Sequence, residues 1–239
     1  MPKAERSKLT LLFFIGISVF GLFTSLMFAL YAPQAQEDSP WRKPLIGSVF
    51  ALICASGTIA AFFPHRCSET FDLPEKNGYT TVQPKRSLSS SLKGHHPKCG
   101  RFSAHAITVR SIVLCAACTG LAAGAIIALS GSILYFFLAY SFEQMGIVAV
   151  VAGQMAVVLG FLQMRFKDGI RLMLNALFVF GAFLVLIGVD MIAESMLFDL
   201  YVIGLIVFWI WTRILLSQWD HFRICHSCDK DCDFKQKRD

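Results

Sequence analysis

Cysteine and histidine side chains lie at metal-binding spacing in the stretch from residue 94 to residue 124. Cys99, His105, Cys115 and Cys118 follow the pattern C-x5-H-x9-C-x2-C. Zinc in closed protein sites takes four thiolate or imidazole ligands, and a Cys-x-x-Cys pair lets two sulfurs reach one ion from a single turn. We therefore predict that these four residues bind zinc, with an iron–sulfur cluster as the alternative cofactor.

A second group of thiols lies in the C-terminal tail, where Cys225, Cys228 and Cys232 follow the pattern C-x2-C-x3-C. Three cysteines leave one zinc coordination position open, and Cys67 or His65 would be the economical fourth ligand. The alternative is a tail whose thiols bind no metal. Ligand histidines need a partner for their other ring nitrogen. Histidines that could serve as reserve ligands or as hydrogen-bonding neighbours of the two sites are His65, His95, His96 and His226.

The elements that would carry these ligands are membrane helices. The chain of 239 residues is 55% hydrophobic and only 16% charged, whereas roughly a quarter of the residues are charged in a water-soluble domain. Apolar segments near the length of about 20 residues that a helix needs to cross a bilayer recur at residues 9–31, 45–63, 119–142, 145–164, 172–189 and 200–216. We predict an all-α bundle of six transmembrane helices in one membrane domain, with the first segment retained as a helix and not removed as a signal peptide.

The distribution of basic residues indicates how these helices are oriented. With six spans, 20 of the 22 Lys and Arg residues lie on the side that carries both termini, and only Arg42 and Lys43 lie on the other. The positive-inside rule then predicts a multi-pass protein of the cell membrane with a cytoplasmic N-terminus and C-terminus. The formal charge of +6 suits anionic lipid headgroups at the cytoplasmic face and is no argument for nucleic acid binding.

The predicted ligands lie on that cytoplasmic side. We predict a cytoplasmic loop at residues 64–118 and a cytoplasmic, cysteine-rich tail at residues 219–239. Together they contain all six histidines and seven of the eight cysteines. A reducing cytosol keeps thiols out of disulfides, so clustered cysteines there indicate metal ligands or redox groups.

The third span needs a break before it enters the membrane. The 37 residues that follow His105, up to Phe142, contain no proline, and as one helix they would extend roughly 55 Å, beyond any bilayer. We place the break at residues 115–119, with a β-hairpin-like or irregular segment at 106–114 and Thr119 as the helix N-cap. The alternative is a helix that starts near Ser111. Gly120 and Gly124 predict a small-xxx-small face for close helix packing.

Few ionisable residues fall near the spans, and we expect none at their centres. Asp190 and Glu194 are four residues apart, so on a helix they would share a face and could bind a cation. We interpret them instead as a water-exposed helix end. Arg213 is expected to extend its side chain to the headgroups. Asp168 lies in a predicted tight turn between the fourth and fifth spans.

The motifs HHPKCGRFSAH and CAACTGLAAG resemble those of small prokaryotic, especially archaeal, multi-span membrane proteins of uncharacterised families. Those proteins have His and Cys residues ahead of a Cys-x-x-Cys-Thr-Gly entry to a helix. The resemblance covers residues 94–124, about an eighth of the chain. It implies a metal-linked membrane protein and brings no activity with it.

The most economical hypothesis is a non-enzymatic membrane scaffold or accessory subunit whose cytoplasmic face is stabilised by zinc, in a homo-oligomer or a larger membrane complex. Alternatives are a redox or electron-transfer protein with an iron–sulfur cluster or reactive thiols, and a transporter of a small solute or metal. An enzyme is less favoured because the sequence has no nucleophile elbow, acidic metal motif or phosphate-binding glycine loop.

Overall fold

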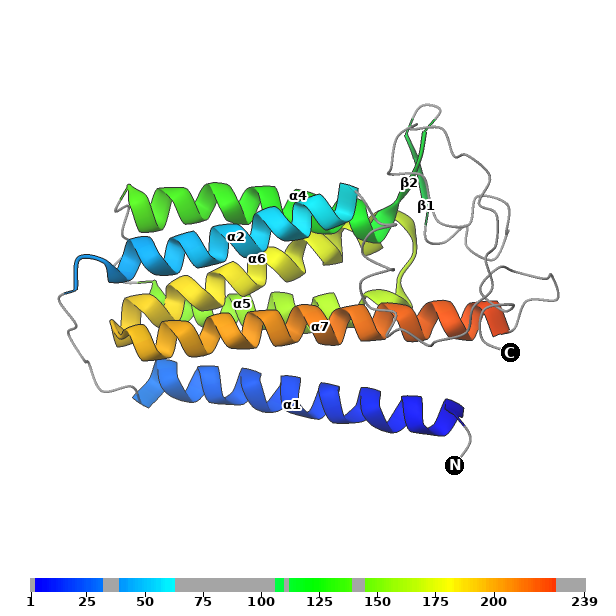
Figure 1. Cartoon of the computed structure of the whole chain (residues 1–239), viewed down its shortest axis with the longest axis horizontal. Coiled ribbons are helices and arrows are strands. Elements are labelled where there is room, and N and C mark those ends of the chain that lie inside the picture. The colour runs from blue at the N-terminus through cyan, green and yellow to red at the C-terminus, as the bar shows by residue number, and fades with distance from the viewer. Residues whose placement is uncertain (1–2, 32–38, 63–105, 110–111, 139–144, 227–239) are drawn as a thin grey trace, which may run out of the picture.

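The protein folds as a bundle of six long helices (Figure 1). The computed structural model describes residues 3–31, 39–62, 106–109, 112–138 and 145–226. The helices are α1 (Lys3–Tyr31), α2 (Arg42–Phe62), α4 (Ala116–Ser132) with its π-helical continuation η2 (Ile133–Phe137), α5 (Gly146–Phe161) with the 3₁₀ turn η3 (Leu162–Arg165), α6 (Asp168–Ala193) and α7 (Met196–His226). All six are long and apolar enough to cross a membrane, which confirms the predicted six-helix fold.

A two-stranded antiparallel hairpin precedes α4. Strands β1 (Ala106–Val109) and β2 (Ile112–Cys115) pair in a register that sets Ala106 opposite Cys115, so the predicted hairpin is present. The prediction of Thr119 as N-cap is wrong, because Cys115 still has extended backbone angles and α4 begins at the next residue. Cys118 therefore lies in the first turn of α4, and the hydroxyl of Thr119 is buried without a hydrogen-bond partner.

The two ends of the bundle differ. One end, here called the hairpin end, carries the strands, the first turn of α1 and the last turn of α7 (Figure 1). At the other, the turn end, α6 connects to α7 through only Glu194 and Ser195. The start and finish of the described chain thus lie at the same end, as an even number of passes requires.

Several helix boundaries differ from the predictions, among them the end of α7 and the start of α6. The stretch from residue 205 to residue 226 contains no glycine or proline that would end a helix. Accordingly α7 continues to His226 and takes up the first part of the tail predicted at 219–239. The tight turn predicted around Asp168 is also wrong, because that residue already begins α6, with Lys167 as the N-cap.

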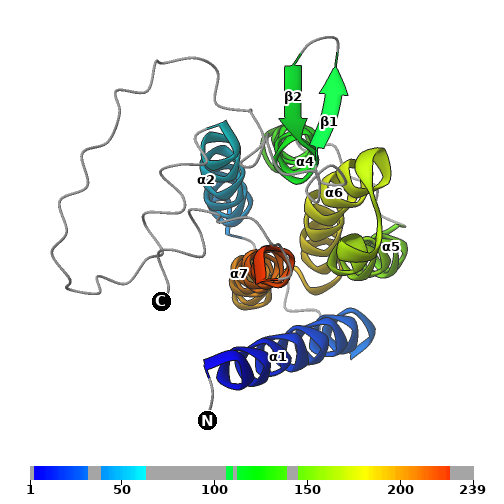
Figure 2. The ribbon, with the colours of Figure 1, turned by 90° about the vertical axis from the view of Figure 1, so that its right-hand side faces the viewer.

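Helix α6 is the central element and is packed between α4 and α5 (Figure 2). Of its most apolar stretch of 18 residues, 61% are buried inside the bundle, a larger share than in any other span. Gly120 and Gly124 of α4 face the α6 backbone, and a Cβ atom at Gly124 would lie 2.6 Å from the carbonyl oxygen of Ala176. This close approach confirms the predicted small-residue packing face.

Glycines also bring α5 against α6, and sequence analysis missed this interface. Gly146, Gly153 and Gly160 are seven residues apart on α5, and Gly181 and Gly188 are seven apart on α6. A Cβ atom at Gly153 would lie 2.6 Å from the carbonyl oxygen of Gly181. The two backbones are in contact along several turns, which is how van der Waals packing holds helices together where lipid replaces water.

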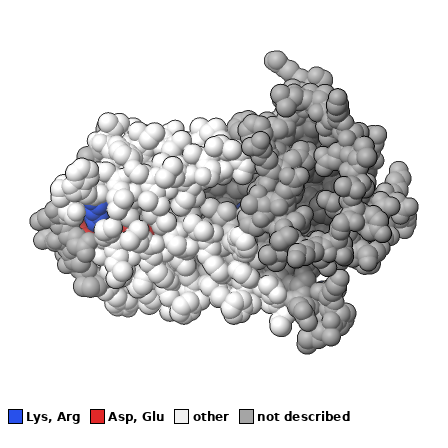
Figure 3. Space-filling view, viewed as in Figure 1, with Lys and Arg blue, Asp and Glu red and all other residues white. Residues whose placement is uncertain are grey.

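Helix α1 is attached to the bundle by hydrogen bonds as well as apolar contacts. Ser18 and Thr212 share a hydrogen bond of 3.0 Å between their hydroxyls. The amide Nε2 of Gln154 in α5 donates to the carbonyl oxygen of Leu22 at 2.8 Å and to Ser25 Oγ at 3.0 Å. Large apolar side chains are exposed along the described helices, and the described part of the face in Figure 3 shows charged side chains only in small spots.

Candidate functional site

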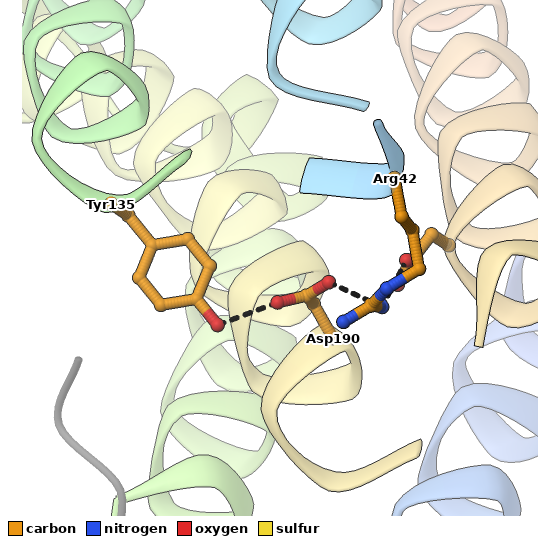
Figure 4. Close-up of polar contacts among 4 residues, drawn as sticks. Arg42, Tyr135 and Asp190 are labelled. Atoms are coloured by element: carbon orange, nitrogen blue, oxygen red, sulfur yellow. Dashed lines mark hydrogen bonds and ion pairs between the residues drawn. The ribbon is translucent and has the colours of Figure 1, made fainter. Parts of the chain in front are cut away.

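Four polar side chains from four elements meet at the turn end and form what we call the turn-end cluster: Arg42, Tyr135, Asp190 and Asp199. Arg42 Nη1 donates to Asp190 Oδ1 and to Asp199 Oδ2, each at 2.7 Å. The hydroxyl of Tyr135 donates to the second oxygen of Asp190 at 2.6 Å (Figure 4). All four side chains are buried, with exposed fractions of 5% or less.

Local backbone features position each member of the cluster. Arg42 is the first residue of α2, Asp190 lies in the last turn of α6, and Asp199 lies in the first turn of α7. Tyr135 lies in the π-helical turn η2; such turns are rare and are frequent at functional sites. Glu194 ends α6 with a left-handed backbone (φ 45°), which lets α7 start two residues later and sets Asp199 beside Asp190.

The cluster contains one positive and two negative formal charges. Both oxygens of Asp190 accept a hydrogen bond, whereas Asp199 Oδ1 is buried and has no hydrogen-bond partner. The interpretation of Asp190 as part of a water-exposed helix end is therefore wrong. Only Glu194, its expected neighbour on that face, is exposed, because the helix ends there and its side chain leaves the bundle.

A second buried group lies nearer the hairpin end and joins α6 to α7. Arg213 donates through Nε to Asn175 Oδ1 at 2.9 Å and through Nη2 to the same oxygen. Asn175 in turn donates to the carbonyl oxygen of Arg171 at 2.6 Å. Arg171 pairs with Asp220 at 3.4 Å. We call these four residues the hairpin-end cluster, and its formal charge is +1.

The burial of Arg213 overturns the expectation that it reaches the headgroups. Its side chain is 5% exposed because it lies on the face of α7 that packs against α6, where the Asn175 oxygen accepts from it twice. A buried guanidinium at this depth is costly unless it is hydrogen-bonded. Arg171 and Asp220 are buried as well, so the ionisable side chains of this cluster lie inside the bundle.

The predicted Cys-x-x-Cys pair lies beside the hairpin-end cluster. Cys115 and Cys118 are both partly exposed, and both lie near enough to Arg213 for their thiolate forms to interact electrostatically with its guanidinium. The start of α4, which follows Cys115 and contains Cys118, packs on α6 through Gly120. An added Cβ atom at Gly120 would lie 2.8 Å from Asn175 Cβ. Tertiary packing therefore brings the cysteine pair next to a buried cationic group.

The described part of the chain contains no group of three or more His, Cys, Asp or Glu side chains arranged to hold a metal. Of the first predicted ligand set, only Cys115 and Cys118 fall within that part. Cys225 and His226 belong to the last turn of α7. The remaining predicted site residues lie outside the described residues: Cys67, Cys99, Cys228, Cys232, His65, His95, His96 and His105.

Comparisons with protein families, curated proteins and solved structures find no match to this chain. The resemblance of residues 94–124 to prokaryotic, especially archaeal, membrane proteins therefore stays a hypothesis.

Proposed function

We propose that the protein is a non-enzymatic multi-pass membrane scaffold or accessory subunit whose hairpin end is stabilised by zinc bound to Cys99, His105, Cys115 and Cys118. The observation that carries the proposal is the strand register. Ala106, which directly follows His105 in the sequence, pairs with Cys115, and successive Cα atoms are 3.8 Å apart. The described residue that follows the proposed histidine ligand in the sequence is thus the strand partner of one proposed sulfur ligand.

The helix start brings the second sulfur to the same place. Cys115 caps α4 and Cys118 lies in its first turn, so the pair spans the single turn from which Cys-x-x-Cys motifs grip one ion. Both side chains are partly exposed, which leaves them accessible to further ligands. Zinc bound in this way would join the hairpin to the helix and stabilise the entry to the bundle.

The charge of the surroundings also fits a thiolate site. Zn²⁺ with three thiolates and one neutral imidazole carries one negative charge in excess. The hairpin-end cluster carries one positive charge in excess, and its Arg213 interacts with Cys115 and Cys118. A buried guanidinium beside the pair compensates a negative metal complex, as opposite charges do in a low-dielectric interior.

The orientation and surroundings of the scaffold form part of the same proposal. The basic residues favour a hairpin end in the cytoplasm, in contact with anionic headgroups, and both termini on that side of the cell membrane. Large apolar side chains exposed along the helices, such as Phe13, Phe20, Ile127 and Met155, suit lipid or the helices of a homo-oligomer or larger membrane complex.

Metal analysis of purified protein tests the zinc proposal. We expect stoichiometric zinc in the native protein and its loss in Cys118→Ala, together with lower thermal stability of that variant. Cys54→Ala is the matched control, because Cys54 is buried in the apolar core of α2 and should not alter the zinc content. A Cys118→Ala protein that folds and retains zinc, or native protein that never contains zinc, would refute this assignment.

The same preparation separates the alternatives. If the protein contains iron in place of zinc and absorbs visible light, the result would favour a redox or electron-transfer protein with an iron–sulfur cluster. Zinc content beyond one ion per chain, reduced in Cys228→Ala, would indicate a second site formed by Cys67, Cys225, Cys228 and Cys232. Flux of a solute or metal across liposomes that contain the protein would favour the transporter.

A further inference from the structure

We propose that the turn-end cluster is a proton-binding site, in which Asp199 holds a proton while Asp190 and Arg42 form an ion pair. This site lies at the opposite end of the bundle from the proposed zinc ligands and does not depend on them. It goes beyond the scaffold function because it would make the packing of one membrane face sensitive to pH.

The first argument is the balance of charge. Arg42 supplies one positive charge, whereas Asp190 and Asp199 would supply two negative charges if both were ionised. Asp190 and Asp199 are fully buried, at 0% exposure, and an uncompensated charge in such a place is far more costly than in water. One bound proton makes the cluster neutral.

The second argument is the distance between the two carboxyl groups. Asp190 Oδ1 and Asp199 Oδ2 each lie 2.7 Å from the same nitrogen, Nη1 of Arg42, so the two oxygens are no farther apart than twice that distance. The carboxyl groups also interact directly with one another. Two carboxylates that share a site repel each other, and one of them then keeps its proton.

The third argument identifies which carboxyl group holds the proton. Asp190 accepts a hydrogen bond at each oxygen, from Arg42 and from the hydroxyl of Tyr135, as an ionised carboxylate should. Asp199 accepts only at Oδ2, and its buried Oδ1 has no donor. A charged carboxylate oxygen that is buried without a donor costs more than the oxygen of a neutral carboxyl group in the same place, so the protonated form suits Asp199 better than Asp190.

Other charged groups near the cluster do not remove the excess charge. The ammonium of Lys43 lies 5.2 Å from the centre of the Tyr135 ring and is partly exposed, so solvent screens it. Glu194 is exposed and would only add negative charge. The other titratable side chains of the described residues at this end are the phenols of Tyr31 and Tyr201, which are uncharged at neutral pH.

Release of the proton would act on four elements at once. The cluster joins α2, η2, α6 and α7, so an excess negative charge there would weaken the contacts that hold the turn end closed. A carboxyl group that stays protonated in the folded protein contributes stability that is lost as the pH rises through its titration. The turn end should therefore loosen in alkaline solution.

Infrared spectroscopy and unfolding measurements test the proposal together. The native protein in detergent should show the C=O stretching band of a protonated carboxylic acid at neutral pH, and Asp199→Asn should lack it. The melting temperature of the native protein should fall from about pH 6 to about pH 9, whereas that of Asp199→Asn should change much less. Glu194→Gln is the control at the same end, and should retain both the band and the slope.

Three outcomes would overturn the proposal. One is a native spectrum without a protonated carboxyl band, a result that needs no variant to fold. Another is an Asp199→Asn protein with the pH slope of the native protein. The third is alkaline stability restored by Na⁺ or K⁺ at constant ionic strength in the native protein but not in Asp199→Asn, because the site would then hold a metal cation in place of the proton. If Asp199→Asn fails to fold, the native spectrum decides.

Discussion

At the scale of single residues, two arginine side chains have a different role from the one that their positions in the sequence predict. Arg42 and Arg213 both lie near the ends of predicted spans, where basic side chains usually reach the headgroups. Each is 5% exposed and hydrogen-bonded to side chains of other helices. Arg42 is therefore a structural partner of two carboxyl groups, and Lys43 is the basic side chain among the described residues that remains partly exposed at that end.

Arg42→Met should destabilise the folded protein strongly, because it leaves the Asp190 carboxylate buried without its cation. Removing one partner of a buried ion pair typically costs about 3–5 kcal/mol. The free energy of unfolding in mixed detergent measures this loss. The control is Lys43→Met on the same helix, whose partly exposed side chain should contribute less than about 1 kcal/mol. Equal effects of the two substitutions would contradict the structural role of Arg42.

At the scale of the elements, backbone contact between helices shapes the bundle. Helix α6 meets α4 through Gly120 and Gly124, and meets α5 through glycines spaced by seven residues. Side chains at these positions would push the helices apart, and in a lipid surrounding the helices associate chiefly through such close packing. The central position of α6 follows from small residues on both of its neighbours.

Gly153→Ala should destabilise the α5–α6 contact, because the added Cβ atom would lie 2.6 Å from the Gly181 carbonyl oxygen and 2.8 Å from the Val185 nitrogen. Overpacking of this kind costs about 1–3 kcal/mol. The control is Gly204→Ala in α7, which meets nothing within 4 Å and should stabilise the helix by up to about 1 kcal/mol. Thermal unfolding of both variants should shift in opposite directions; a shared direction would argue against the glycine interface.

At the scale of the whole molecule, the two ends of the bundle contain different chemical groups. The hairpin end combines the cysteine pair with a cluster of positive formal charge, and the turn end has the cluster with two carboxyl groups. Six passes place the first turn of α1 and the last turn of α7 together (Figure 1). The cysteine pair and the turn-end cluster thus lie at opposite ends of the bundle.

A thiol-labelling experiment should detect this separation. In intact cells a membrane-impermeant maleimide should label Glu194→Cys, because residue 194 is exposed at the turn end and the proposed orientation puts that end outside. The native protein should label only after the membrane is permeabilised and zinc is removed, since the proposed orientation puts seven of its eight cysteines in the cytoplasm and the eighth, Cys54, is buried. Labelling of the native protein in intact cells would reverse the proposed orientation.

Hydropathy and loop length were sufficient to predict the six helices, the hairpin before α4 and the packing face of Gly120 and Gly124, because span length and local breaks are properties of short stretches of chain. The sequence also supplied the spacing of Cys115 and Cys118. The turn-end cluster could not be found in this way, since its members are separated by up to 157 residues and come from four elements. Only the tertiary structure decided that Asp190 and Asp199 face Arg42. Packing against the neighbouring helices sets the rotation of each helix about its axis, and that rotation determines which polar side chains are buried together.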